Sequence, residues 1–357
     1  MQTKINESTF AGQEIFVGID VHLKSWKVTV MAGDMHLKTF SAPPDPGKLF
    51  GYLRTHYPGA TYNTAYEAGF SGFWAHREFA KLGVNSIVVN PADIPTTDKE
   101  RKQKEDRRDS RKIAKTLQAK QLRGIFIPSE KMQQDRALLR ARDAILSDLR
   151  RNKARTKGLL YFHGIQYPER FENSGWSKQF LEWLRNIKFD HNCGRSALDA
   201  LLDMVEHQRT LLLRLTRQVR ELSKSDEYNK KVELLLSVPG LGILTAMRFL
   251  TELGTLHRFP TFPKFCSYIG IVPSTDSSAD KEIVLGITPR RNLQLRTAIV
   301  ESAWIAVRRD PALLTAYQTL RNRMPANKAI VRIAKKLLSR IWHVLHKEEQ
   351  YEMGVIR

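Results

Sequence analysis

Short runs of alternating apolar and polar residues fill the N-terminal third of the chain, and this period of two is typical of β-strands. Three such runs follow one another closely, a fourth comes later, and a short run of apolar residues predicts a fifth strand. The runs cover residues 15–21, 26–30, 36–41, 61–68 and 86–90. Helical patterns lie on either side of the fourth run, at residues 49–57 and 72–82. Three adjoining strands and then alternating helices and strands predict an α/β domain with a mixed sheet over residues 1–126.

Further along the chain, apolar positions recur every three or four residues, which is the helical period. Residues 106–121 show this pattern, and residues 130–160 and 196–225 give two long amphipathic helices. Their length predicts an antiparallel helical arm or coiled coil over residues 127–228. The stretch between the two helices, with its aromatic run at residues 171–183, is predicted to form the connecting tip.

The remaining residues, 229–357, are predicted to form a mostly helical domain with one glycine- and serine-rich interruption. The turn Val238-Pro239-Gly240-Leu241-Gly242 fits a helix-hairpin-helix, whose exposed N–H groups hold phosphate, and fits a simple turn between helices equally well. The glycine- and serine-rich stretch 273–286 is predicted to be a loop.

The charge balance indicates a polyanionic partner. The sequence holds 58 Lys and Arg against 37 Asp and Glu, a formal net charge of +21. Membrane surfaces are the rival polyanion, but the sequence has no run of about 18 apolar residues and no signal-peptide pattern. Nucleic acid is therefore the expected partner. The two isolated cysteines, Cys193 and Cys266, argue against a disulfide framework or a zinc site and fit a cytoplasmic protein.

Basic residues concentrate in residues 99–123, in the predicted arm and in the C-terminal helices. An excess in all three regions predicts an extended path for a phosphate backbone, with binding that weakens strongly as salt rises. Aromatic side chains near the arm tip could stack on bases, although core packing or contacts between protomers are the more common roles. These aromatic side chains are Trp176, Phe180 and Trp183.

Four carboxylates in the first half occur in the order that a metal-dependent phosphoryl-transfer site requires. Asp20 ends the first apolar strand and Glu67 ends the fourth, where a charge is costly unless it is paired or binds a metal. Asp106 and Asp109 are three residues apart, so a helix places both on one face. Mg²⁺ prefers hard oxygen ligands, and two such ions can clamp the attacking and leaving oxygens of a phosphoryl transfer. Acids early in a helix are also favoured by its dipole, which leaves a local role open for Asp106 and Asp109.

The segments that contain these acids are similar to those of a known family. They are Val17-Gly18-Ile19-Asp20-Val21, Tyr66-Glu67-Ala68-Gly69, Val89-Asn90-Pro91 and Lys104-Glu105-Asp106-Arg107-Arg108-Asp109-Ser110-Arg111-Lys112-Ile113-Ala114. Together they resemble the N-terminal DEDD domain of the IS110-family transposases. The resemblance implies an RNase H-like, RuvC-like fold in which Asp20, Glu67, Asp106 and Asp109 bind Mg²⁺, or alternatively Mn²⁺.

The resemblance continues in the second half, which looks like the C-terminal transposase domain of the same family. The matching segments are Leu236 to Gly242, Thr251 to Gly254, Tyr268 to Ser274, Gly286 to Thr288, Asn292 to Arg296 and Glu301 to Trp304. By this resemblance Ser278 is the serine nucleophile, with Ala279 where the family has glycine and Ser277 as its neighbour. No histidine lies nearby in sequence, which favours activation of the serine by the carboxylates of the first domain. Pro289-Arg290-Arg291 replaces the family's usual lysine–glycine element.

These features predict a DNA transposase or recombinase that cuts and rejoins donor and target DNA through a phosphoserine intermediate. One alternative is a RuvC-like structure-specific or Holliday-junction endonuclease that uses only the carboxylates, and another is a nucleic-acid-binding protein without activity. The resemblance implies a structured guide RNA as a partner, and strand exchange between several active sites implies a dimer or tetramer. The basic side chains expected to contact nucleic acid are Arg107, Arg108, Arg111, Lys112, Arg290, Arg291 and Arg296.

Overall fold

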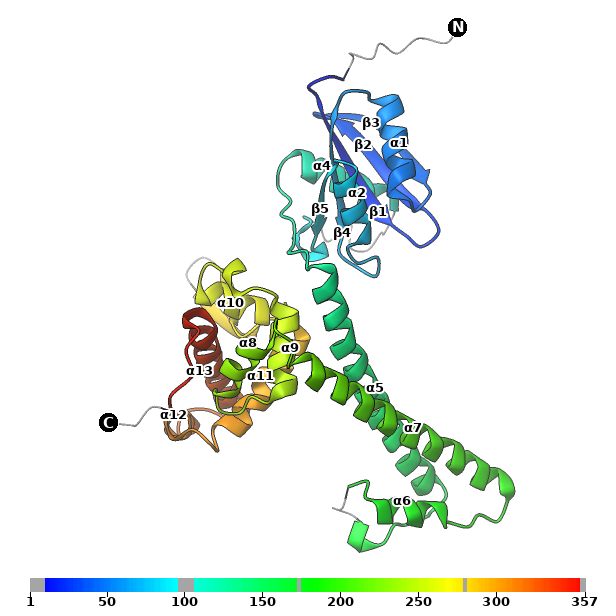
Figure 1. Ribbon diagram of the computed structural model, residues 1–357, viewed down its shortest axis with the longest axis vertical. Helices are drawn as coiled ribbons and strands as arrows, with labels where there is room; N and C mark the ends of the chain where they lie inside the picture. Colours follow the sequence, from blue (N-terminus) through cyan, green and yellow to red (C-terminus); the bar gives the residue numbers. More distant parts are fainter. Residues whose placement is uncertain (1–9, 96–105, 172–174, 279–280, 354–357) are drawn as a thin grey trace. The chain divides into compact units, whose positions relative to one another are not determined.

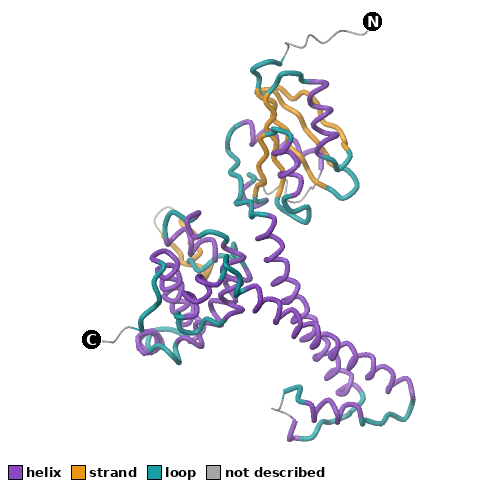
Figure 2. Tube along the Cα trace, viewed as in Figure 1, coloured by secondary structure: helices purple, strands orange, loops and turns teal. Residues whose placement is uncertain are grey.

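The computed structural model describes residues 10–95, 106–171, 175–278 and 281–353, with the backbone alone described at 106–107 and 275–285 (Figure 1). The chain divides into two compact units, residues 1–127 and 128–357. The first unit combines strands and helices, whereas the described residues of the second are helical apart from one hairpin (Figure 2). The predicted combination of a mixed-sheet domain, a helical arm and a mostly helical C-terminal region is confirmed.

The first unit is built on one five-stranded sheet with the order β3-β2-β1-β4-β5 (Figure 1). The strands are β1 (Glu14–Val21), β2 (Trp26–Ala32), β3 (Met35–Ala42), β4 (Thr61–Glu67) and β5 (Asn85–Val89). The first three strands form an antiparallel meander, while β4 pairs parallel to β1 and β5 pairs parallel to β4. The sheet is therefore mixed, and the central strand β1 joins its antiparallel and parallel halves.

Helices cover both faces of this sheet. The odd-numbered residues of β1, such as Ile15 and Val17, pack with α1 (Pro46–His56) and α2 (Trp74–Lys81). On the opposite face, Phe16 packs with α4 (Asp106–Gln118) through Ala114. Period-two alternation in a strand produces this division, because successive side chains point to opposite faces. The short helix η1 (Pro91–Asp93) follows β5.

The arm in the second unit consists of two long helices, α5 (Glu130–Phe162) and α7 (Asn192–Leu222). Their antiparallel pairing is visible in two hydrogen bonds, from Arg142 Nε to Thr216 Oγ1 at 2.9 Å and from Asn152 Nδ2 to Gln208 Oε1 at 3.0 Å. The residue numbers rise along one helix as they fall along the other. The prediction of an antiparallel helical arm is therefore confirmed.

The tip of the arm contains η2 (Glu169–Phe171) and α6 (Lys178–Arg185). Phe180 is buried there in a cluster that also contains leucines of both long helices, and Trp176 and Trp183 pack against this cluster. Of the roles considered for these aromatic residues, core packing is the one that the contacts favour.

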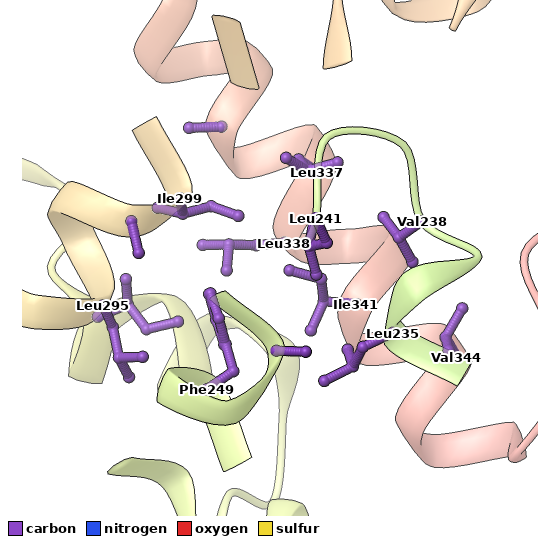
Figure 3. Packing of buried hydrophobic residues seen from close by; sticks show 14 of the residues in the cluster. Leu235, Val238, Leu241, Phe249, Leu295, Ile299, Leu337, Leu338, Ile341 and Val344 are labelled. Carbon is purple, nitrogen blue, oxygen red and sulfur yellow. The ribbon is translucent and has the colours of Figure 1, made fainter. Parts of the chain in front are cut away.

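The rest of the second unit is a compact group of helices around one apolar core (Figure 3). Its helices are α8 (Asn229–Leu236), α9 (Ile243–Leu253), η3 (Leu256–Arg258), α10 (Phe262–Ile269), α11 (Leu293–Ala306), α12 (Pro311–Arg321) and α13 (Ala326–Lys347). Leu338 and Ile341 of α13 are completely buried in this core, which also contains Phe249 of α9 and Ile299 of α11. Among the described residues, no helix combines the length and apolarity needed to cross a membrane.

The predicted loop at 273–286 is instead an antiparallel hairpin of β6 (Pro273–Ser278) and β7 (Lys281–Ile287). The sequence prediction was wrong because the polar run of β6 lacks an apolar period, whereas a two-stranded ladder is held by backbone groups that every residue supplies. We call these two strands the serine hairpin.

The Pro-Gly turn between α8 and α9 is tightly packed. Gly240 has a φ of +87°, and a Cβ at this position would lie 2.4 Å from the carbonyl oxygen of Ser302 in α11. Val238 and Leu241 on either side are buried. Glycine is thus required here for a left-handed turn against α11, which favours the interpretation as an inter-helix packing turn.

Candidate active site

Asp20 and Glu67 lie at the carboxyl ends of two neighbouring parallel strands. Ile19 of β1 is in register with Tyr66 of β4, so Asp20 and Glu67, which follow them, lie side by side at this end of the two strands. Asp20 shares the face of β1 that Phe16 presents to α4, and Glu67 shares the face of Ala65, which packs with Ile113 of the same helix. The side chain of Asp20 is 21% exposed, and Glu67 is exposed. Both carboxylates therefore flank the same end of the α4-covered face.

A glycine brings α4 directly onto β1. A Cβ at Gly18 would lie 2.1 Å from the carbonyl oxygen of Ser110 and 2.4 Å from the amide nitrogen of Ala114, so only glycine fits this contact. The hydroxyl of Ser110 is also within 2.9 Å of the Thr29 hydroxyl of β2, in a buried hydrogen bond. These two contacts fix the start of α4 against the sheet.

The fixed start of α4 carries the second pair of acids. Asp109 immediately precedes Ser110 and lies one turn before the buried Ile113, and it is half-buried. Asp106 is the first residue of the helix, one turn before Asp109, and its side chain lies outside the described residues. Within the described part of the chain, no three His, Cys, Asp or Glu side chains are grouped closely enough to hold a metal ion.

His22 is a neighbour of this region that the sequence analysis missed. Its Nε2 lies 3.1 Å from Oδ2 of Asp20, just beyond the end of β1. The i, i+2 spacing in extended chain could have indicated that both side chains leave on the same face. The carboxylate oxygens in this region are hard donors of the kind that Mg²⁺ prefers.

Basic side chains surround the start of α4. Arg108 and Arg111 are exposed and Lys112 is half-buried, while the side chain of Arg107 lies outside the described residues. The expected contact of these side chains with nucleic acid stays a prediction.

Ser278 is the last residue of β6, and its backbone pairs with Lys281 across the serine hairpin. Its side chain and that of Ser277 lie outside the described residues. The strand assignment places Ser278 directly at the turn of the hairpin rather than within an extended loop.

The arginines that follow the serine hairpin differ in their surroundings. Arg290 and Arg291 are exposed. Arg296 is half-buried in the first turns of α11, where its Nη1 donates to the carbonyl oxygen of Thr288 at 2.7 Å. Burial and the neighbouring charge of Arg291 lower the pKa of Arg296. At least one donor of Arg296 is therefore used to hold the chain and not a nucleic acid.

Two family models match the chain in consecutive segments. Residues 17–164 match the DEDD IS110 transposase model, which is described as "Transposase". Residues 232–318 match a model described as "Transposase IS116/IS110/IS902 family". The first match spans the strands and helix that carry Asp20, Glu67, Asp106 and Asp109, and the second spans the serine hairpin.

Individual relatives agree with these matches. The chain is 26% identical over 348 residues to the transposase for insertion sequence element IS1533 of Leptospira borgpetersenii, covering 91% of this chain and 96% of that protein. It is 26% identical over 296 residues to the transposase for insertion sequence element IS1111A of Coxiella burnetii, covering 80% and 78%. The protein y4qE of Sinorhizobium fredii is 30% identical over 239 residues, which are 67% of this chain and 57% of y4qE.

Proposed function

The chain belongs to the IS110 family of transposases, and we propose that it cuts and rejoins DNA through a phosphoserine intermediate formed at Ser278. The observation that carries this proposal is the pair of family matches, in order, over an acidic N-terminal site and a C-terminal serine hairpin. Relatives that match most of the chain are named as transposases of insertion sequences.

Asp20, Glu67, Asp106 and Asp109 are the proposed ligands of a divalent cation, Mg²⁺ or alternatively Mn²⁺. Support comes from the common face of Asp20 and Glu67 and from the packing of α4, which carries the other two acids, on that face. All four donors are hard oxygens. When bound, Mg²⁺ would supply Lewis-acid stabilisation of charge on the phosphate oxygens. The exposed Arg108 and Arg111 would hold the DNA backbone beside these carboxylates.

In the proposed reaction, Oγ of Ser278 attacks a DNA phosphorus atom. The Oγ–P bond forms and the bond from phosphorus to the 3′-oxygen breaks. A base accepts the serine proton, and the departing 3′-oxygen takes up a proton to become a 3′-hydroxyl. A 3′-hydroxyl from the other duplex then attacks the phosphoserine, which restores the serine and joins the two DNAs. Two transesterifications conserve the number of phosphodiester bonds, so no energy-supplying cofactor is required.

The proposed partners are donor and target DNA, a structured guide RNA and further copies of this chain, within the cytoplasm of a bacterial or archaeal cell. The net charge of +21 supports binding to nucleic acids over an extended path. Exchange between two duplexes needs several active sites, which supports a dimer or tetramer. The arm, the N-terminal unit and the C-terminal helices are proposed as three functional parts.

Trapping of a protein–DNA adduct tests the proposal. Full-length protein would be incubated with Mg²⁺, fluorescent DNA carrying the element ends, and RNA transcribed from the flanking non-coding DNA, and then analysed on a denaturing SDS gel. We expect an SDS-stable adduct in the native protein that is lost in Ser278→Ala, in Asp20→Asn and in EDTA. Ser277→Ala is the matched control and should retain it.

Two results would contradict parts of the proposal. DNA cleavage that continues unchanged in Ser278→Ala would indicate a nuclease that uses water and the carboxylates alone. Products that are unchanged in Asp20→Asn, with Mg²⁺ present, would exclude a catalytic role for the acidic site.

A further inference from the structure

We propose that Glu252 is a positioning residue that couples the root of the arm to the serine hairpin. The root is the part of α5 that contains Arg136, Arg140 and Asp143. This inference rests on the proposed role of the hairpin in strand transfer. It concerns a buried carboxylate in α9 that the proposed reaction does not itself use.

The contacts of Glu252 with the arm are extensive. The guanidinium of Arg140 makes a bidentate contact with the carboxylate. Its Nε donates to Oε1 at 2.8 Å and its Nη2 donates to Oε2 at 3.0 Å. Arg136 donates to the carbonyl oxygens of Thr251 and Glu252 at 3.0 and 3.3 Å. Glu252 is only 3% exposed, and a buried carboxylate is tolerated only when it is paired and hydrogen-bonded. The arm root therefore supplies the charge that keeps Glu252 inside.

The same carboxylate holds the start of α11. Asn292 Nδ2 donates to Glu252 Oε2 at 3.1 Å, while Asn292 Oδ1 accepts the N–H of Leu295 at 3.1 Å and so caps the helix. The backbone N–H of Asn292 donates to the Tyr268 carbonyl oxygen at 3.1 Å, and the Tyr268 hydroxyl donates to the Glu252 carbonyl oxygen at 3.2 Å. Oε2 of Glu252 is thus shared by Arg140 of the arm and by Asn292 of the helix cap.

From the cap, two further bonds lead to the hairpin. Arg296, one turn into α11, donates to the Thr288 carbonyl oxygen at 2.7 Å. The N–H of Thr288 donates to the Val272 carbonyl oxygen at 3.0 Å. Thr288 directly follows β7 and Val272 directly precedes β6, so this bond closes the base of the serine hairpin. An arm movement that displaces Arg140 is therefore transmitted through Oε2, the cap and Arg296 to the strand that ends at Ser278.

The negative charge of Glu252 is balanced by the positive charges of Arg140 and Arg136. Burial raises the pKa of the Glu252 carboxyl, but the hydrogen bonds and charges of Arg140 and Arg136 outweigh burial and hold that pKa below its ordinary value. The hydrogen bond to Glu252 raises the pKa of Arg140. Both groups are therefore charged at neutral pH, and the link persists under the conditions in which a transposase works.

A second ion pair joins the same two helices and offers a matched control. Arg248 of α9 donates through Nη2 to both carboxylate oxygens of Asp143 in α5, at 2.6 and 2.7 Å. Asp143 also accepts a hydrogen bond from Nη1 of Arg142, its neighbour in the arm, at 3.3 Å. This pair holds the arm to α9 as the Glu252 pair does, without reaching the helix cap.

The test compares Glu252→Gln with Asp143→Asn in the full-length chain. Hydrogen exchange followed by mass spectrometry, on protein without DNA, measures opening of residues 273–296 directly. We expect exchange there to accelerate about tenfold or more in Glu252→Gln, as the loss of hydrogen bonds to a charged group predicts. Asp143→Asn should accelerate exchange in α5 and α9 and leave residues 273–296 unchanged. Equal exchange of residues 273–296 in both variants would overturn the proposal.

A second measurement separates positioning from structural damage. In Glu252→Gln, the rate of adduct formation with bound DNA should fall about tenfold or more, for the same reason, while the dissociation constant for DNA stays unchanged. A rate equal to that of Asp143→Asn would overturn the positioning role. If Glu252→Gln does not fold, Arg140→Lys keeps the charge but loses the two-pronged contact, and the same two comparisons apply. Because hydrogen exchange needs no DNA, it tests the coupling even if native protein forms no adduct and the proposed function fails.

Discussion

Replacement of Gly18 by alanine adds a single methyl group at the tightest contact between β1 and α4. The new Cβ would lie 2.1 Å from the Ser110 carbonyl oxygen and 2.4 Å from the Ala114 amide nitrogen. Non-bonded atoms of this size settle at about 3.5 Å, so α4 has to retreat by roughly 1 Å. The atoms in the way belong to the helix backbone, which cannot move aside as a flexible side chain would.

The size of the effect follows from this displacement. Overpacking of a well-packed contact costs about 1–3 kcal/mol, and weakening the Thr29–Ser110 hydrogen bond adds about 1 kcal/mol. A loss of about 2–4 kcal/mol is large against a domain stability of about 5–15 kcal/mol. It corresponds to a fall in melting temperature of about 8–16 °C for a unit of this size. Because Asp109 is a proposed metal ligand, a shift of about 1 Å there should also slow the proposed adduct formation about 100-fold.

Thermal unfolding followed by circular dichroism, together with the adduct assay, measures both effects. Gly51→Ala is the control, because Gly51 lies exposed within α1 with nothing within 4 Å of an added Cβ. Alanine in a helix interior should stabilise that variant by up to about 1 kcal/mol. A melting temperature of Gly18→Ala equal to that of the native chain would refute the reasoning, because α4 would then accommodate the methyl group without moving.

Three further outcomes test other parts of the structure. Burial and the charge of Arg77 lower the pKa of His76 from its ordinary value of 6.5, so the unfolded chain takes up a proton before the folded one does. The free energy of unfolding should therefore fall as pH drops through about 6.5, and urea titrations should show less of this fall in His76→Gln. Cys266 is buried and burial raises its thiol pKa to about 11, whereas Cys193 is exposed. Maleimide should therefore react with Cys193 alone until urea unfolds the protein, as mass spectrometry can measure. Leu338→Ala, in the core of Figure 3, should cost about 2–5 kcal/mol of unfolding free energy in guanidinium titrations. A loss below about 0.5 kcal/mol, as at exposed positions, would contradict its place in that core.

Local patterns predicted the elements of the first unit well. The apolar alternation around Ile15, Val17 and Ile19 is strong because one face of β1 packs with α1 and α2, and the pattern records that burial directly. Asp20 and Glu67 could be placed at strand ends for the same reason, since each interrupts an otherwise buried run. Their neighbouring positions in the sheet follow from the parallel pairing of β1 with β4.

Contacts between distant segments left no such signal. Glu252 is paired with Arg140, 112 residues away, and neither residue breaks the helical pattern around it. In the sequence Gly18 is indistinguishable from any other glycine in a strand. Only the structure shows that the backbone of α4 packs directly against it. The serine hairpin was missed because its strand ending at Ser278 is polar on both faces, and its pairing depends on a register that side-chain hydropathy does not encode.

The position of the unit boundary has a consequence for synthesis of the chain on the ribosome. Every strand and helix of the first unit, including the bridge from Val89 to Gly124, is encoded before residue 128. Domains tend to fold in order as they emerge, so the sheet can be complete while the arm is still being made. Glu252 lies 112 residues after its partner Arg140. At ordinary translation rates of about 5–20 residues per second, it is therefore synthesised roughly 6–22 s later. During that interval the nascent chain contains its complete first unit but not yet the serine hairpin, so the proposed strand transfer has to wait until β6 and β7 have been made.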